Sequence, residues 1–138
     1  MGRHDVFSDC LPVFEAAFVD GKACDAMCSY NSIDSIPVSM DHEILTDVLR
    51  DRYGMPGFVR SDMTAVSRLY DWHFIAETPE EAIRLGLEAG VDLQLYDFPH
   101  DVWQNAIACL IEEGKMKNVR AGYGLPPRTA DEIPVGIV

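Results

Sequence analysis

The sequence predicts an α/β fold built from about three parallel β/α units. Three short apolar stretches, at residues 26–28, 58–60 and 91–95, alternate with segments whose apolar residues recur at helical spacing. Each stretch has the length of a buried strand, and the connections between segments are short. Strands that alternate with helices in this way pair in parallel through right-handed crossovers.

The first unit begins with a helix that we expect from Cys10 to Val19. Its apolar residues form one stripe, and Gly21 is placed to end it. The stretch at 26–28 then forms the first strand. The residues of the stripe are Leu11, Phe14, Ala17 and Phe18.

The second unit starts after a loop at residues 31–40, which are rich in Ser, Asp and Pro. Asp41 is the expected N-cap of a helix that runs through Tyr53, with several aliphatic residues on one face. Glycines and a proline at 54–57 break the chain, and the stretch at 58–60 forms the second strand.

The third unit repeats this pattern. Thr78 is the expected N-cap of a helix over residues 79–89, because a proline and two acidic residues follow it. Gly90 ends that helix, residues 91–95 form the third strand, and an amphipathic helix covers residues 99–114.

The domain predicted from these units covers residues 1–115. Residues 116–138 are rich in Gly and Pro and show no periodicity, so we expect an irregular tail there. A small parallel sheet of this kind leaves two open edges, which predicts either self-association or a complementary chain that covers them.

The composition excludes some classes of function. The chain has 11 basic and 23 acidic residues and a formal net charge of −12, so its surface would repel nucleic acid, whereas neutral ligands such as sugars remain open. It has no apolar run of about 20 residues and no apolar N-terminal signal, which predicts no membrane span and a soluble, cytoplasmic protein. Cys24 and Cys28 lack a second ligand pair, so the cysteines are expected to be buried thiols, and no metal or organic cofactor is expected.

Polar residues follow each predicted strand. Tyr30, Asp62 and Asp97 stand at the carboxyl ends, where ligands bind in α/β folds. Asp62 could instead be the N-cap of the next turn, and Tyr30 could be a core aromatic residue whose hydroxyl is hydrogen-bonded.

An ordered set of motifs resembles glycoside hydrolase family 3, of the β-glucosidase type, over about residues 7–115. In that family a strand ending in Ser-Tyr-Asn precedes a loop with a proline and a Leu-Thr-Asp helix, and a later Ser-Asp carries the nucleophile. The matching segments are Ser-Tyr-Asn at 29–31, Ile-Pro-Val at 36–38, Leu-Thr-Asp-Val-Leu-Arg at 45–50, Gly-Phe-Val-Arg-Ser-Asp at 57–62 and Ala-Gly-Val-Asp-Leu at 89–93.

The resemblance implies a partial (β/α)8 TIM barrel, specifically the C-terminal portion of the family's N-terminal domain. It also implies a retaining hydrolase of terminal β-linked sugars in which the carboxylate of Asp62 forms a covalent glycosyl intermediate. Tyr30 would bind the substrate beside the cleaved bond. His73 resembles a histidine found a little after the nucleophile in the family, but its spacing favours a structural role.

Two residues depart from the family pattern. Met63 replaces an aromatic residue after the nucleophile, and Arg60 stands at an apolar strand position, where burial would require a partner. The family's acid/base and several sugar-binding residues have no counterpart in the sequence, so we expect no activity from the chain alone. The expected ligand is a β-glucoside or related oligosaccharide; the alternative is a non-catalytic sugar-binding or structural fragment that another chain completes.

Overall fold

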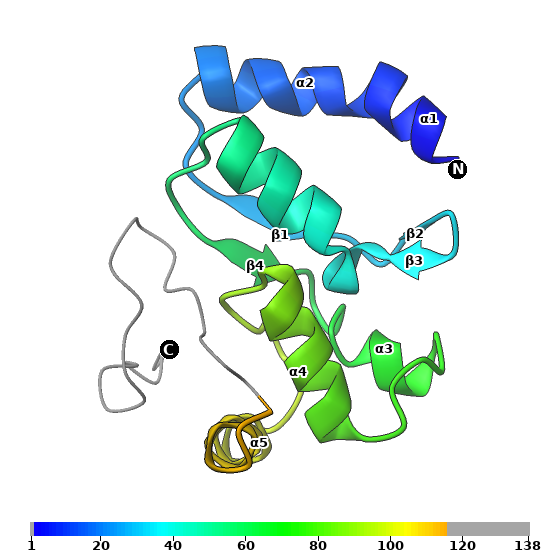
Figure 1. The fold of residues 1–138 in the computed structure, drawn as a ribbon, viewed down its shortest axis with the longest axis vertical. Helices are drawn as coiled ribbons and strands as arrows, with labels where there is room; N and C mark the ends of the chain where they lie inside the picture. The colour runs from blue at the N-terminus through cyan, green and yellow to red at the C-terminus, as the bar shows by residue number, and fades with distance from the viewer. Residues whose placement is uncertain (1, 116–138) are drawn as a thin grey trace.

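The structure is a computed structural model, and it describes residues 2–115. In Figure 1 an N-terminal helical stretch lies above a short parallel sheet, and further helices lie beneath the sheet. The irregular tail predicted at 116–138 lies outside the described residues.

The N-terminal helical stretch is longer than the sequence pattern indicated. It comprises α1 (Arg3–Asp5), η1 (Val6–Cys10), α2 (Leu11–Glu15) and η2 (Ala16–Asp20), so it begins at Arg3 rather than Cys10. The earlier start follows from the burial of Val6, which extends the apolar stripe toward the N-terminus.

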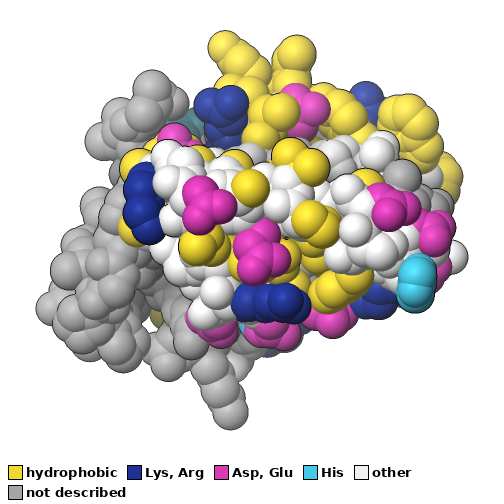
Figure 2. All heavy atoms as spheres, turned by 90° about the horizontal axis from the view of Figure 1, so that it is seen from above, with side chains coloured by type: hydrophobic (Ala, Val, Ile, Leu, Met, Phe, Trp, Pro, Cys, Tyr) yellow, Lys and Arg dark blue, Asp and Glu magenta, His cyan; other side chains and the backbone are white. Residues whose placement is uncertain are grey.

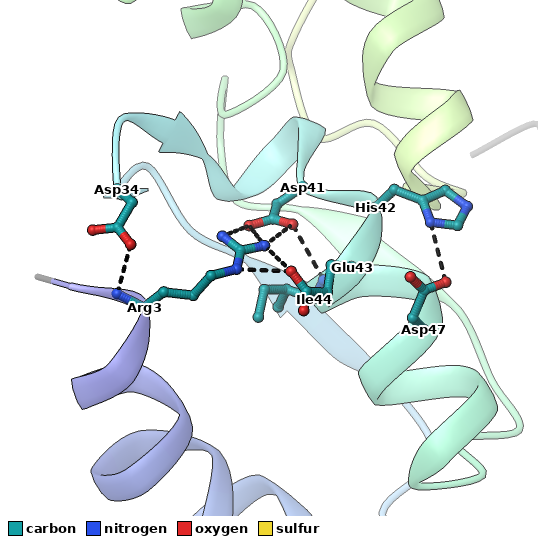
Figure 3. A network of polar contacts seen from close by, with 7 residues as sticks. All are labelled: Arg3, Asp34, Asp41, His42, Glu43, Ile44 and Asp47. Atoms are coloured by element: carbon teal, nitrogen blue, oxygen red, sulfur yellow. Dashed lines mark hydrogen bonds and ion pairs between the residues drawn. The ribbon is translucent and has the colours of Figure 1, made fainter.

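Arg3 attaches this stretch to the rest of the fold (Figure 3). Its backbone N–H donates to Asp34 at 2.9 Å, and its guanidinium donates to Glu43 through Nε at 2.7 Å. The same guanidinium pairs with Asp41 at 3.3 Å. Asp41 also accepts from the N–H of Ile44 at 3.3 Å, so it caps the following helix as the sequence predicted.

The first two predicted strands are confirmed. β1 (Ala26–Cys28) and β4 (Val59–Ser61) pair in parallel, with Cys28 opposite Ser61. The loop expected between them contains a short antiparallel hairpin, β2 (Ser32–Ile33) and β3 (Ile36–Pro37), and a 3-10 turn, η3 (Val38–Met40), which the sequence analysis did not predict.

The third predicted strand is reduced to a single parallel bridge between Arg60 and Leu93. The segment does lie along β4, since the N–H of Ser61 donates to the carbonyl of Leu93 at 2.8 Å. The ladder stops because side chains take the next donor: the N–H of Leu95 bonds to the hydroxyl of Ser61 and to the carboxylate of Asp97. The described residues thus show two β/α units and a third extended segment, and the partial barrel stays a prediction.

The later helices agree closely with the predicted ranges. They are η4 (Glu43–Arg52), α4 (Pro79–Ala89) and α5 (His100–Glu112), and a short helix, α3 (Arg68–Asp71), lies between the second and third units. Thr78 accepts from the N–H of Glu81 at 3.2 Å, which confirms it as the N-cap of α4. Gly90 ends α4 with φ +117°, a conformation that side chains disfavour.

One face of the sheet is buried and the other is exposed. Cys28, Val59 and Ser61 are buried, whereas Met27, Arg60 and Leu93 are exposed. Arg60 is therefore solvated within the part of the chain that the structure describes. The buried face belongs to one core that also includes Leu45 and Leu49 of η4 and Ala82 and Ile83 of α4.

The start of β4 is held by a partly buried ion pair. Arg50 of η4 pairs with Asp92, and its guanidinium also donates to the carbonyls of Gly57 at 2.9 Å and Gly90 at 3.1 Å. Asp92 in turn accepts from the N–H of Val59 at 2.7 Å. This cluster joins η4, β4 and the extended segment at the end of the sheet opposite Asp62.

Seen from above, the molecule carries hydrophobic side chains among charged ones (Figure 2). The exposed hydrophobic residues of the N-terminal stretch include Val13, Phe14 and Val19. Across residues 2–115, none of the helices combines the length and apolar character required to span a bilayer. The expectation of buried cysteines holds for Cys28 but not for Cys24 and Cys109, which are exposed.

Candidate functional site

The carboxyl ends of β1 and β4 bring Tyr30 and Asp62 to the same edge of the sheet. The strands are parallel and adjacent, with Cys28 opposite Ser61, so the residues that follow them emerge together. The N–H of Asp62 donates to the carbonyl of Cys28 at 3.2 Å, which continues the pairing just beyond β4. This edge is where α/β folds place their ligands.

Asp62 opens a tight turn and is half-buried. Its backbone carbonyl accepts from the N–H of Ala65 at 2.9 Å, and its carboxylate accepts from the N–H of Met63 at 2.7 Å. The next helix, α3, has Ser67 as its N-cap residue. Asp62 therefore does not cap α3, but its carboxylate accepts from the first N–H of the turn at residues 63–67, so the alternative in which Asp62 caps that turn stays open.

Tyr30 lies beside this turn with its side chain 38% exposed, so it is not a core residue. Its hydroxyl donates to the carbonyl of Met63 at 2.5 Å. Local desolvation raises the pKa of Tyr30, and the negative charge of Asp62 raises it further. The phenol and the carboxylate thus interact electrostatically at the edge of the sheet.

His73 also reaches this edge. Its Nε2 lies 3.1 Å from the backbone carbonyl of Tyr30, and the structural role expected for His73 stays a prediction. Nearby, Arg68 stacks over the ring of Trp72 at 4.7 Å from the centroid. The positive charge of Arg68 opposes the rise in the pKa of Tyr30, so Arg68 also acts on the site.

Asp97 has a role at this site that its sequence context does not indicate. It follows the third extended segment, as predicted, but it is buried, with 7% of its surface exposed. Its carboxylate accepts from the hydroxyl of Ser61 and from the N–H groups of Val66 at 2.6 Å, Ser67 at 3.0 Å and Leu95 at 3.1 Å. Burial raises the pKa of Asp97, and the hydrogen bond from Ser61 and the three from the backbone partly offset that rise.

Met63, at the position where the resemblance leads us to expect an aromatic residue, is 53% exposed beside Asp62. Within residues 2–115, no three His, Cys, Asp or Glu side chains gather as metal ligands would. The arrangement therefore offers a half-buried carboxylate beside a phenol, on a turn whose backbone is held by a second carboxylate. Such a group can act as a nucleophile or as a base.

A separate cavity of about 380 Å³ lies between the N-terminal stretch, β1 and η4. Neither Tyr30 nor Asp62 lines it, and most of its lining is apolar. A sugar needs several polar partners, so this cavity is a poor candidate for a carbohydrate site. Its apolar lining includes Val6, Leu11, Phe14, Met27, Ile33, Val38, Ile44, Leu45 and Leu49.

Comparison with known proteins gives a consistent result. Residues 1–122 match the glycosyl hydrolase family 3 N terminal domain. A putative beta-xylosidase of Formosa agariphila is 41% identical over 91 residues, which are 66% of this chain and 12% of that protein. A periplasmic beta-glucosidase of Salmonella typhimurium is 34% identical over 116 residues, which are 84% of this chain and 14% of that protein.

A solved structure agrees with these sequence relatives. The beta-glucosidase of Listeria innocua is 33% identical and superposes with a TM-score of 0.75, over 84% of this chain and 15% of that chain. The chain thus spans only about one seventh of the length of these relatives. The family match begins at residue 1, so it does not bear out the expectation that only the C-terminal portion of the domain is represented.

The family description fits most of the 138 residues, and it fits the segment that contains Tyr30, Asp62 and Asp97. The relatives that share this segment carry the names of enzymes that cleave glycosidic bonds. The chain therefore belongs to glycosyl hydrolase family 3.

Proposed function

We propose that this chain carries the nucleophile of a retaining β-glycosidase site, with Asp62 as the nucleophile and Tyr30 beside the sugar. The observation that carries the proposal is the placement of the Asp62 carboxylate next to the Tyr30 phenol at the carboxyl end of two parallel strands. The ordered family motifs around both residues support it.

In this mechanism the carboxylate of Asp62 attacks the anomeric carbon and displaces the leaving group. The product is a glycosyl ester of Asp62, which water then hydrolyses with retention of configuration. The N–H of Met63, 2.7 Å from a carboxylate oxygen, fixes the direction of the side chain. Tyr30 lies beside the sugar. Its hydroxyl already donates to the carbonyl of Met63, so its oxygen would bind the sugar by accepting from a sugar hydroxyl.

A retaining site also needs a second carboxyl about 5 Å from the nucleophile. Asp97 is unsuited to that role, because four donors already occupy its carboxylate. We propose that the acid/base group comes from outside residues 2–115, on a further part of the protein or on another chain. The chain alone should then be nearly inactive, since acid/base assistance contributes about 10²–10⁴-fold.

The remaining strands of a (β/α)8 barrel belong to the same proposal. The exposed sheet face formed by Met27, Arg60 and Leu93 is the side that such strands would enclose. The substrate class is a terminal β-linked glucoside or xyloside. Structures of the Listeria innocua beta-glucosidase with glucose and with laminaribiose, and the beta-xylosidase names of other relatives, support this range.

A chimera tests the proposal. Residues 2–115 would replace the superposed segment of the Listeria innocua beta-glucosidase, and the release of 4-nitrophenol from β-D-glucoside and β-D-xyloside substrates would be measured. We expect turnover by the chimera and none by the chain alone. Asp62→Ala in the chimera should lower kcat by at least ~1,000-fold, because it removes the nucleophile.

The matched control is Asp101→Ala, which removes an exposed carboxylate of α5. It should leave turnover within about twofold of the parent chimera. Turnover that survives Asp62→Ala would remove Asp62 from the mechanism. A folded chimera that binds glucose but never turns over would favour the alternative of a non-catalytic sugar-binding segment.

A further inference from the structure

The carboxylate of Asp97 connects two turns that are distant in the sequence. One oxygen accepts from the N–H groups of Val66 and Ser67, in the turn that begins at Asp62. The other oxygen accepts from the Ser61 hydroxyl and from the N–H of Leu95. Asp97 is thus bonded to the residue just before Asp62 and to the turn just after it.

All the hydrogen-bonding partners of this carboxylate are donors. An ionised carboxylate is purely an acceptor and satisfies all four, whereas an amide of the same shape must turn its NH₂ group toward some of them. Hydrogen bonds to a charged, buried acceptor are stronger than neutral ones. The ionised form of Asp97 is therefore the one that the surrounding backbone is arranged to hold.

Both connected turns contain strained backbone. Thr64 has φ +66° and Tyr96 has φ +55°, in the left-handed region that non-glycine residues disfavour. The two turns also bond directly, because the N–H of Thr64 donates to the carbonyl of Leu95 at 3.0 Å. Such strain persists only where surrounding contacts hold it, and the bonds of Asp97 to the neighbouring residues Val66, Ser67 and Leu95 are among those contacts.

We propose that Asp97 is a positioning residue for the nucleophile: its buried carboxylate holds the turn at residues 62–67 in the conformation that presents Asp62. This inference rests on the proposed function for its catalytic meaning, but the structural part stands on the hydrogen bonds alone. Asp97 touches neither the substrate nor the reacting atoms in this scheme. It acts through Ser61, Val66 and Ser67.

Asp92 provides a matched comparison within the same segment. It is also a largely buried carboxylate bonded to β4, but its partners are Arg50 and the N–H of Val59, at the opposite end of the sheet. A loss of charge at Asp92 should loosen the fold without moving the turn that carries Asp62. The pair Asp97→Asn and Asp92→Asn therefore separates positioning from general stability.

The first measurement is amide hydrogen exchange and pH titration by NMR on the ¹⁵N-labelled 138-residue chain. Asp97→Asn should speed amide exchange at Val66, Ser67 and Leu95 by about tenfold more than at the slowest-exchanging core amides, which report global unfolding. It should also shrink the pH-dependent shift of the Met63 amide, which bonds directly to the Asp62 carboxylate. Asp92→Asn should instead affect Val59 and leave the Met63 response unchanged.

The second measurement is made in the chimera described above. Asp97→Asn should lower kcat by about tenfold or more while KM changes less than twofold, because a displaced nucleophile impairs the transition state more than ground-state binding. Should Asp97→Asn fail to fold, Ser61→Ala removes only the hydroxyl donor and keeps the carboxylate. The proposal is supported if Ser61→Ala speeds amide exchange at Leu95 and reduces the pH-dependent shift of the Met63 amide. It is overturned if neither quantity changes.

The outcomes distinguish the two proposals. A chimera that folds and binds glucose but is inactive with Asp62 intact refutes the proposed function, and the exchange data still decide whether Asp97 holds the turn. Unchanged exchange at residues 66, 67 and 95 in folded Asp97→Asn, or an unchanged Met63 response, overturns the positioning role. If Asp92→Asn and Asp97→Asn reduced the Met63 response and kcat equally, Asp97 would be a stabilising residue only, and the positioning role would likewise be overturned.

Discussion

Asp92 and Asp97 lie at the two ends of one extended segment, and each uses its carboxylate to hold one end of β4. Asp92 accepts from the N–H of Val59, where β4 begins, and Asp97 accepts from the hydroxyl of Ser61, where β4 ends. Asp62 follows β4 directly. The extended segment that holds both ends of β4 therefore also fixes the position of Asp62. The extended segment pairs with β4 through side chains as much as through the backbone.

The partly buried ion pair at the start of β4 should contribute strongly to stability. Arg50→Met leaves the Asp92 carboxylate and the carbonyls of Gly57 and Gly90 without the guanidinium, so we expect a loss of about 3 kcal/mol in the free energy of unfolding. Urea unfolding at neutral pH measures it.

The control for that experiment is Arg84→Met. Arg84 pairs with Glu88 on the exposed side of α4 at 2.6 Å, and such surface pairs contribute about 0.5 kcal/mol or less. Equal losses in the two variants would show that the Arg50 cluster has no special role.

The pKa of Tyr30 should depend on Asp62. A neighbouring carboxylate opposes formation of the phenolate, so Asp62→Asn should lower the pKa of Tyr30, while local desolvation keeps part of the rise. NMR titration of chains with ¹³C-labelled tyrosine rings measures this, with Tyr30→Phe used to assign the signal. Asp101→Asn, which removes a distant exposed charge, should leave the titration unchanged; an equal shift in both variants would mean that Asp62 and Tyr30 do not interact.

The cysteines should differ sharply in reactivity. Burial raises the pKa of the Cys28 thiol to about 11, so at pH 8 only ~0.1% of it is thiolate, and the side chain is also inaccessible. Cys24 and Cys109 are exposed and should be alkylated by iodoacetamide much faster. Peptide mass spectrometry assigns each site. Alkylation of Cys28 at the rate of the exposed cysteines, in the folded chain, would contradict its burial.

Local sequence signals predicted the helices and their ends well. Thr78 and Asp41 cap helices as expected, because a cap depends only on residues within one turn. The first two strands were also predicted, since each is a short apolar run between breaking residues. The N-terminal stretch was underestimated because only Val6 marks its buried side before Cys10.

Local sequence signals could not predict hydrogen bonds between residues that are distant in the sequence. The third strand looked regular in the sequence, yet side chains of Ser61 and Asp97 take the N–H of Leu95 and end the ladder. Nothing local to Asp97 indicates that its partners lie about 30 residues earlier in the chain. Similarly, the exposure of Arg60 depends on which face of the sheet the helices cover. The candidate pair of Tyr30 and Asp62 was found because parallel strands deliver their following residues to one edge.

The identity of the nucleophile is tested most directly by trapping the covalent intermediate. The chimera that hydrolyses 4-nitrophenyl β-D-glucoside would be incubated with a 2-deoxy-2-fluoro-β-glucoside, digested and analysed by peptide mass spectrometry. The account predicts one glycosyl adduct, on the peptide that contains Asp62 and on its side chain, and no adduct in Asp62→Ala. An adduct on any other carboxylate, or labelling that persists in Asp62→Ala, would contradict it.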